Sequence, residues 1–226
     1  MAIALVASTS KGSSDSGASV TTDAVDTSGA NLIVISATTF GSGAITPTDS
    51  KGNTWTALTS HNQGSYFSRF YYCASPTVGT GHTFTLSGVG SYPVLSAMAF
   101  SGALGASPAD QENGAGTASG TSLATGSITP SEDNCVVVAG ISTDPGTGHA
   151  MSGYTVAQSD WVNSEHIGGG ISYLVQTTAA AANPSWSWTG ASAGVASIAS
   201  FKAAAVASGN PAVGGRGRLR HWGLVP

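Results

Sequence analysis

Two short runs of apolar residues dominate the hydrophobic pattern of the chain. Residues 32–35 read Leu-Ile-Val-Ile, and residues 135–138 read Cys-Val-Val-Val. Each run follows a polar segment rich in turn-forming residues, at 26–30 and at 129–133. A strand that is apolar at every position, and not only at every second one, is buried on both of its faces. We therefore expect two central β-strands whose outer faces are covered either by a loop of the same chain or by a neighbouring subunit.

The remaining strands are shorter and alternate between apolar and polar positions. Clear examples are residues 54–58 and 82–86, in which every second residue is apolar or aromatic. Turn signals made of Gly, Pro, Asn and Asp separate such segments roughly every 8–12 residues. This pattern predicts antiparallel sheets that pack one face on a core.

The pattern also repeats along the chain. Asn31 corresponds to Asn134, 103 residues later, and each precedes one of the two apolar runs. Residues 83–88 correspond to residues 185–190 at a distance of 102, and the distance shrinks to 101 at the end of the repeat. A distance that drifts by so little indicates an internal duplication in which strands are kept and loops are trimmed.

We therefore expect an all-β fold, an antiparallel, jelly-roll-like β-sandwich built from two sequence repeats related by a pseudo-twofold axis. The body covers residues 1–207, with repeat one at about 1–103 and repeat two at about 104–207. Two separate sandwiches side by side are the alternative, but no Pro-rich or charge-rich linker divides the halves. Residues 208–226 break the repeat and form a tail.

Charge is scarce and unevenly placed. Charged residues make up 8% of the 226 positions and the net charge is −4, whereas ordinary soluble domains contain about 25% charged residues. Because little repulsion separates one copy from another, we expect a homo-oligomer. The body has too few basic residues to hold a nucleic-acid backbone, so nucleic acid is not an expected partner. Three of the four arginines, Arg216, Arg218 and Arg220, lie in the tail.

Neither export nor membrane insertion is indicated. No segment reaches the roughly 18 consecutive apolar residues that a membrane-spanning helix needs. The first residues, Met-Ala-Ile-Ala-Leu-Val-Ala, lack a basic region and predict a first strand rather than a signal peptide. Cys73 and Cys135 lie in apolar, strand-like runs, which favours two buried free thiols. A single disulfide between them is the alternative.

The sequence contains no motif that indicates a particular enzymatic reaction. Residues 190–194, Gly-Ala-Ser-Ala-Gly, match the nucleophile-elbow pattern, but that motif needs a strand followed by a helix and here it joins two strands. Asp144 and His149 flank a Pro-Gly turn and are too isolated for a typical metal site. Asp49 lies in a loop that could bind Ca²⁺, but it is not part of an EF-hand run. We expect a protein that is not an enzyme, with no catalytic residues, no metal and no cofactor.

Two polar loops occupy equivalent places in the two repeats. One covers residues 60–66 and the other residues 159–166, and each combines an aromatic side chain with amide, carboxylate or imidazole groups. Aromatic faces and planar polar groups are what a sugar-binding site uses, although a loop aromatic that simply covers the end of the sandwich is the alternative. The candidate ligand-binding residues are His61, Asn62, Tyr66, Asp160, Trp161, Asn163 and His166.

The tail combines basic and apolar residues. Its arginines alternate with glycine and leucine, and a tryptophan follows. This composition is typical of a peptide that orders on a partner, with a frayed chain end as the alternative. The residues expected to anchor it are Arg216, Arg218, Leu219, Arg220, Trp222 and Leu224.

Three stretches resemble small Ser/Thr/Gly-rich proteins encoded among bacteriophage structural genes. They are residues 49–55 (Asp-Ser-Lys-Gly-Asn-Thr-Trp), residues 71–85 and the Gly/Arg-rich end. The resemblance covers roughly residues 20–100, and the second repeat more loosely. It implies a structural protein on the exterior of a virion, either a capsid decoration, a head fibre or a tail fibre. It also implies other virion proteins as partners, assembly in the host cytoplasm and no catalytic residues.

A carbohydrate-binding, lectin-like or receptor-binding module is the second interpretation. Its partner would be a glycan on the host surface, bound by the paired polar loops. The two roles are compatible, because a virion protein can also recognise a receptor.

Overall fold

The computed structural model describes residues 2–17, 19–41, 45–87, 91–161 and 167–205, without the side chains of Asp160 and Trp161. Over these residues the chain is all-β and contains no helix. The predicted all-β class with antiparallel sheets is therefore confirmed. Two large sheets and one small sheet account for the regular structure.

The first large sheet takes its strands from the first half of the chain. Its order is β1-β8-β3-β6-β5, and every pair of neighbours is antiparallel. In its central strand β3, eight of the nine residues are buried, as the apolar run in its sequence requires. The bounds are β1 (Ala4–Gly12), β3 (Leu32–Phe40), β5 (Thr56–Gln63), β6 (Tyr66–Ala74) and β8 (Ser91–Ser101).

The second large sheet takes its strands from the second half. Its order is β11-β14-β10-β13-β12, and β9 pairs with the other side of β14. Both β9 and β14 are unusually long, and β14 pairs with β9, β10 and β11. The bounds are β9 (Ala109–Ala124), β10 (Cys135–Thr143), β11 (Thr147–Met151), β12 (Thr155–Trp161), β13 (Gly168–Gln176) and β14 (Ser185–Phe201).

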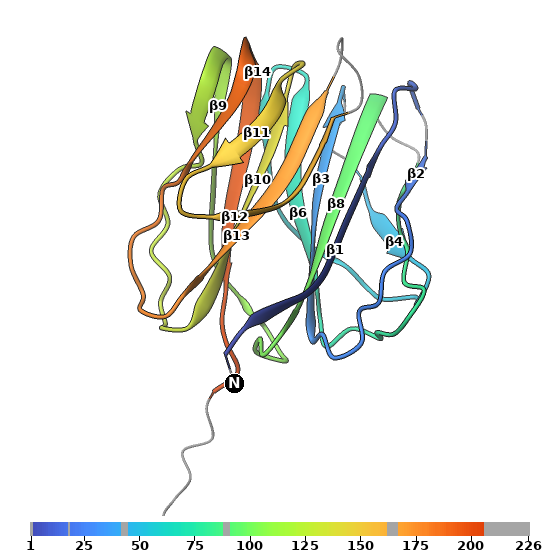
Figure 1. The fold of residues 1–226 in the computed structure, drawn as a ribbon, viewed down its shortest axis with the longest axis vertical. Helices are drawn as coiled ribbons and strands as arrows, with labels where there is room; N and C mark the ends of the chain where they lie inside the picture. Colours follow the sequence, from blue (N-terminus) through green and yellow to red (C-terminus); the bar gives the residue numbers. More distant parts are fainter. Residues whose placement is uncertain (1, 18, 42–44, 88–90, 162–166, 206–226) are drawn as a thin grey trace, which may run out of the picture.

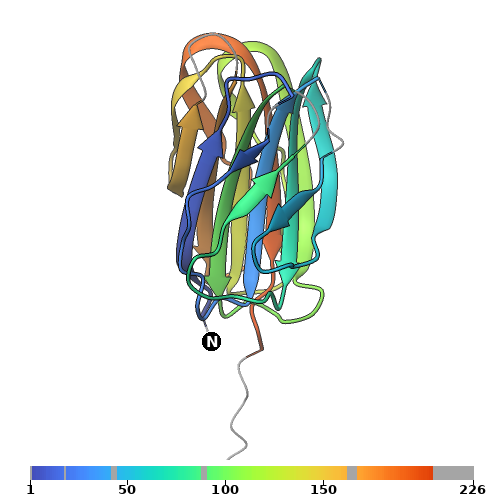
Figure 2. The ribbon, with the colours of Figure 1, turned by 90° about the vertical axis from the view of Figure 1, so that its right-hand side faces the viewer.

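The small sheet covers the outer face of the first large sheet. It has the order β2-β7-β4, with bounds β2 (Val20–Thr21), β4 (Pro47–Asp49) and β7 (Phe84–Leu86). Figure 1 shows β2 and β4 at the right of the molecule and β9 and β14 at the left. Figure 2 shows the short strands of this sheet lying across the first large sheet.

The main core lies between the two large sheets. Val34 and Phe70 of the first sheet pack in one buried cluster with Val138, Ile171 and Phe201 of the second. Hydrophobic residues from both halves of the chain therefore share a single interior. This arrangement agrees with the expected single body and disagrees with two sandwiches side by side.

The outer faces of the two central strands are covered by the chain itself. In β3, Ile33 and Ile35 are fully buried in a cluster that includes Phe84 of the small sheet. In β10, Val137 is buried in a cluster with Ile128 and Ala182, which lie in segments outside the large sheet. Cover by loops and short strands thus accounts for strands that are apolar at every position. These strands give no reason to require a neighbouring subunit.

The two large sheets have the same strand order. This holds for the long strands, without the short β11. Numbered within each half of the chain, they lie in the order first, fifth, second, fourth, third: β1-β8-β3-β6-β5 and β9-β14-β10-β13-β12. The edge strand β5 contacts β9, and the edge strand β12 contacts β1. Each edge of the sandwich therefore brings together a third strand of one half and a first strand of the other.

Candidate functional site

The first predicted ligand loop is a tight β-hairpin. Residues Ser60 to Gln63 belong to β5, Tyr66 begins β6, and the turn contains Gly64 with a positive φ of 58°. The polar residues that predicted a loop occupy an edge strand, whose exposed face tolerates them. The expected loop is therefore replaced by paired strands, and its side chains alternate between the two faces of the sheet.

His61 packs against the neighbouring sheet. A Cβ atom added to Gly114 of β9 would lie 2.2 Å from Cγ of the His61 ring. Burial lowers the pKa of His61, while the nearby Glu112 carboxylate opposes that shift. Asn62 is exposed and its amide donates a 3.5 Å hydrogen bond to the Gly64 carbonyl. His61 thus has a packing role that the sequence did not indicate.

The second predicted ligand loop is only partly described. Asp160 and Trp161 end strand β12, where their backbones pair with Gly169 and Gly168. Asn163 and His166 lie outside the described residues, as does the whole predicted anchoring tail from Arg216 to Leu224. Strands β5 and β12 lie in different sheets and at opposite edges of the sandwich. The structure therefore does not gather the described members of the two loops into one site.

Tyr66 belongs to a different cluster, which the sequence analysis missed. Its ring packs edge to face on Phe40 with centroids 5.2 Å apart, and Phe40 lies 6.4 Å from Tyr92. Burial and a hydrogen bond to the Asp144 carboxylate raise the pKa of Tyr66. Tyr92 has a positive φ of 56°, which is uncommon for a bulky residue. Phe40 and Asp144 lie at the ends of the two central strands, and this shared position is the sequence signal that could have revealed the cluster.

Asp49 organises the turn that follows β4. Its carboxylate accepts hydrogen bonds from the Lys51 amide at 2.8 Å, the Asn53 amide at 3.2 Å and the Trp55 indole at 3.0 Å. Asn53 in turn forms two hydrogen bonds with the backbone of Thr77, at 2.7 and 3.0 Å. The predicted turn chemistry is therefore present, and it extends to a loop far away in the sequence.

The same carboxylate holds His82. Oδ1 of Asp49 lies 3.1 Å from Nε2 of His82, and Nδ1 of His82 lies 2.9 Å from Oγ1 of Thr27. Burial lowers the pKa of His82, and the hydrogen bond to Asp49 opposes that shift. The segments at residues 49–55 and 71–85, which carry the resemblance to phage proteins, are thus joined by one hydrogen-bonded network.

A hydroxyl, an imidazole and a carboxylate in this order resemble a hydrolase triad in geometry. The Thr27 side chain is completely buried, however, and its hydroxyl is engaged by both the carbonyl and the amide of Gly79, at 3.2 and 3.1 Å. A nucleophile must reach its substrate, and this hydroxyl cannot. The network therefore serves to fix the small sheet and its loops.

His149 forms a second buried network. Its Nε2 atom lies 2.9 Å from Oγ1 of Thr143, and its Nδ1 atom lies 3.2 Å from Oγ of Ser159. Burial lowers the pKa of His149 to about 4, so the imidazole is neutral at ordinary pH. Asp144 bonds to Tyr66 instead of sharing a metal with His149. Among the described residues, no group of three potential ligands could hold a metal ion.

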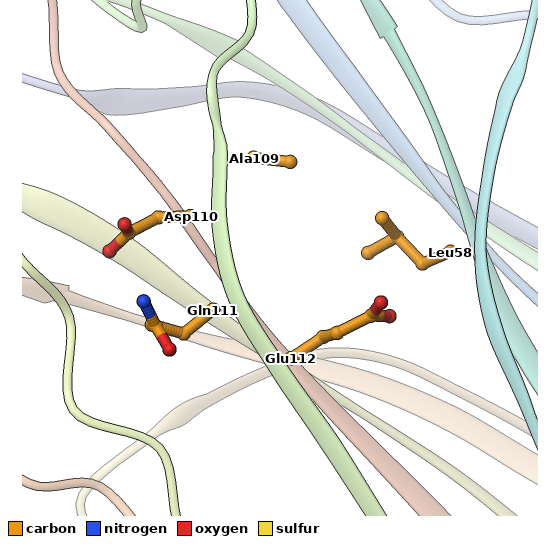
Figure 3. Close-up of a pocket in the computed structure, with 5 residues that line it drawn as sticks. All are labelled: Leu58, Ala109, Asp110, Gln111 and Glu112. Atoms are coloured by element: carbon orange, nitrogen blue, oxygen red, sulfur yellow. The ribbon is translucent and has the colours of Figure 1, made fainter.

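A small surface pocket lies where β5 meets β9. Figure 3 shows its lining, which consists of Leu58 from β5 and Ala109 to Glu112 from β9. The pocket has a volume of about 80 Å³, which is well below the usual size of a small-molecule site.

Both carboxylates of the pocket are already engaged. Glu112 accepts hydrogen bonds from the amide and the hydroxyl of Thr59, at 2.8 and 2.9 Å. Asp110 accepts two from Ser131, each 2.7 Å long, which help to lower its pKa. These bonds fasten the edge of the second sheet to its surroundings.

Cys73 and Cys135 are both free and buried. Burial raises the pKa of Cys73, and it raises the pKa of Cys135 to about 11. Since the thiolate is the reactive form, neither side chain is an activated nucleophile. The prediction of two buried free thiols is confirmed.

No helix of the described chain is long and apolar enough to span a membrane. In comparisons with known proteins, no family model, no curated protein and no solved structure matches this chain.

Proposed function

We propose that this protein is a non-enzymatic structural component on the exterior of a bacteriophage virion, attached or assembled through its C-terminal tail. The observation that carries the proposal is that the two ends of the sandwich differ. The N-terminus and the end of β14 lie together at one end of the sandwich (Figure 1), where Ala103 and Ala203 pair. The aromatic cluster around Tyr66 lies at the other end of the same strands.

A body of this kind suits an outward-facing role. Residues 206–226 follow in the chain from the end of the sandwich where the N-terminus and the end of β14 lie, so a tail anchored to a particle would leave the opposite end free. The buried histidine networks maintain the fold, and the resemblance in residues 49–55 and 71–85 falls on one of them. The partners in this proposal are other virion proteins and further copies of the chain, and the location is the virion surface after assembly in the host cytoplasm.

We also propose that the body arose by internal duplication and has jelly-roll-like, pseudo-twofold symmetry. The sequence correspondence and the identical strand order of the two large sheets support this origin.

The proposal can be tested on particles. Antibodies against the body should label the outside of purified virions in electron microscopy when the full chain is produced in the host. A chain that ends after Ser208 should lose this labelling while its circular dichroism spectrum stays unchanged. Undiminished labelling with the shortened chain would remove the tail from the proposal, and absence of the full chain from all particles would reject the virion role.

A carbohydrate-binding, receptor-type module is a second candidate. The cluster of Phe40, Tyr66 and Tyr92 beside Asp144 favours it, because aromatic rings and a carboxylate at one end of a sandwich suit a sugar ring and its hydroxyls. Binding on a glycan array that is lost in Tyr92→Ala would favour this candidate, and loss in Trp161→Ala would favour the loop that the sequence indicated.

A further inference from the structure

Strand β9 has a long edge that pairs with no described strand, although side chains of β5 contact part of it. It pairs with β14 along one side, from Ala109 to Ala124, and no described strand pairs with its other side. The strand has 16 residues and contains no proline, since Pro108 precedes it. Unpaired amide and carbonyl groups on such an edge readily accept another extended segment. An edge of this length therefore calls for an occupant.

Acidic groups surround the lower part of this edge. In Figure 3, Asp110 and Gln111 lie on one side of β9, and Glu112 and Leu58 lie on the other. Glu132 joins this group through Lys202, whose ammonium lies 3.6 Å from both the Asp110 and the Glu132 carboxylates. This ammonium thus lies between two carboxylates, next to the small pocket that Leu58 and Glu112 line.

The chain continues from a point next to this edge. The Lys202 amide donates a 2.8 Å hydrogen bond to the Pro108 carbonyl, immediately before β9 begins. Residues 206–226 begin four residues after Lys202. The ten residues 206–215 can span at most about 35 Å, which is ample to bring Arg216 to the start of β9.

The C-terminal segment has the complementary chemistry. Arg216, Arg218 and Arg220 place three positive charges within five residues of the chain. Leu219 and Trp222 supply apolar side chains of a size to cover Leu58 and Ala109. Opposite charges on adjacent strands stabilise their pairing.

We propose that residues 216–224 dock on the β9 edge of their own chain, with the arginines against the exposed Glu112 and Glu132 carboxylates. A short tether gives the segment a high effective concentration at this edge, so the contact is intramolecular. The docking does not depend on the virion role. In a protein that does use its tail as an anchor, the edge would hold the tail until a stronger partner competes for it.

Limited proteolysis of the full chain tests the docking. Trypsin cuts after arginine, and mass spectrometry can follow cleavage at positions 216, 218 and 220. In Glu112→Gln/Glu132→Gln, which keeps side-chain shape and one of the two oxygens that accept from Thr59, tail cleavage should become roughly three- to tenfold faster at about 50 mM salt. The matched control, Asp15→Asn/Asp23→Asn, removes the same charge from exposed positions elsewhere and should cleave like the wild type.

Varying the salt and protein concentrations tests whether the contact is electrostatic and whether it is intramolecular. Raising salt to about 500 mM should bring the wild-type cleavage rate close to that of the double variant, because exposed charges are then screened. Equal rates in the wild type, the double variant and the control would overturn the proposal. Protection that increases with protein concentration would also overturn it, because the occupant would then be the tail of another copy.

A second measurement leaves the body untouched. Hydrogen–deuterium exchange of β9 amides in the full chain should be several-fold faster in Arg216→Gln/Arg218→Gln/Arg220→Gln than in the wild type, because docking pairs or covers the edge. The amides of β12, an edge strand at the opposite side, serve as the internal reference and should not change. Unchanged exchange of β9 in this variant would reject the docking.

Discussion

At the scale of single residues, Asp49 shows why the short polar segment at residues 49–55 matters for the fold. Local chemistry predicts that an Asp before Ser-Lys-Gly-Asn makes a turn, and the bonds to Lys51 and Asn53 confirm it. The bonds to Trp55 and His82 could not be predicted, since the pairing with His82 crosses 33 residues of chain. The carboxylate therefore joins one turn to the loop of another strand.

We expect Asp49→Ala to lower the free energy of unfolding by about 3 kcal/mol, because it leaves the half-buried Trp55 indole and the buried His82 imidazole without an acceptor. Urea unfolding followed by circular dichroism measures the change. Asp23→Ala is the control, because the Asp23 side chain is 86% exposed, and it should shift the free energy by less than about 0.5 kcal/mol. Similar small losses in both variants would show that the network does not stabilise the fold.

At the scale of elements, two strands were not predicted because their sequences are polar. Residues 60–63 were expected to be a loop and belong to β5, and the polar, Gly-rich stretch at 109–124 is the long strand β9. Both strands lie at sheet edges, where few positions need to be apolar. The contact between these edges is close because Gly114 and Gly116 leave room for His61 and Gln63.

The Gly114→Ala substitution should destabilise the protein by about 1–3 kcal/mol, because its new Cβ would overlap the His61 ring. The double variant His61→Ala/Gly114→Ala removes the clashing ring and should recover most of this loss relative to His61→Ala alone. Thermal or urea unfolding of the four proteins in the cycle gives the coupling. Additive losses would mean that His61 does not pack on β9 in solution.

At the scale of the whole molecule, the two halves share one core. Val34 from the first sheet and Val138 from the second belong to the same buried cluster, together with Phe70 and Phe201. Neither large sheet keeps its inner face covered without the other. The repeats that the sequence indicates are therefore not independent folding units.

We expect a single cooperative unfolding transition, with tryptophan fluorescence and far-ultraviolet circular dichroism giving the same midpoint. Fluorescence reports on both halves, because Trp55 lies in the first and Trp186 in the second. Val34→Ala and Val138→Ala should each lower the stability of this one transition by about 2 kcal/mol. Two separate unfolding transitions would contradict a shared core. A variant that shifts the midpoint measured by fluorescence but not the midpoint measured by circular dichroism, or the reverse, would also contradict it.

The all-β class and the two central strands could be predicted from the sequence alone, and the structure confirms both. Periodicity, turn residues and apolar runs are local properties, and they specify a strand wherever it later lies. What covers Ile33 and Val137 became clear only from tertiary contacts, and these contacts also place strands β5 and β12, which carry the described parts of the two candidate loops, at opposite edges. They also join His82 to Asp49. These outcomes depend on contacts between residues far apart in the chain, and a local pattern carries no information about which distant segment will fill a given face.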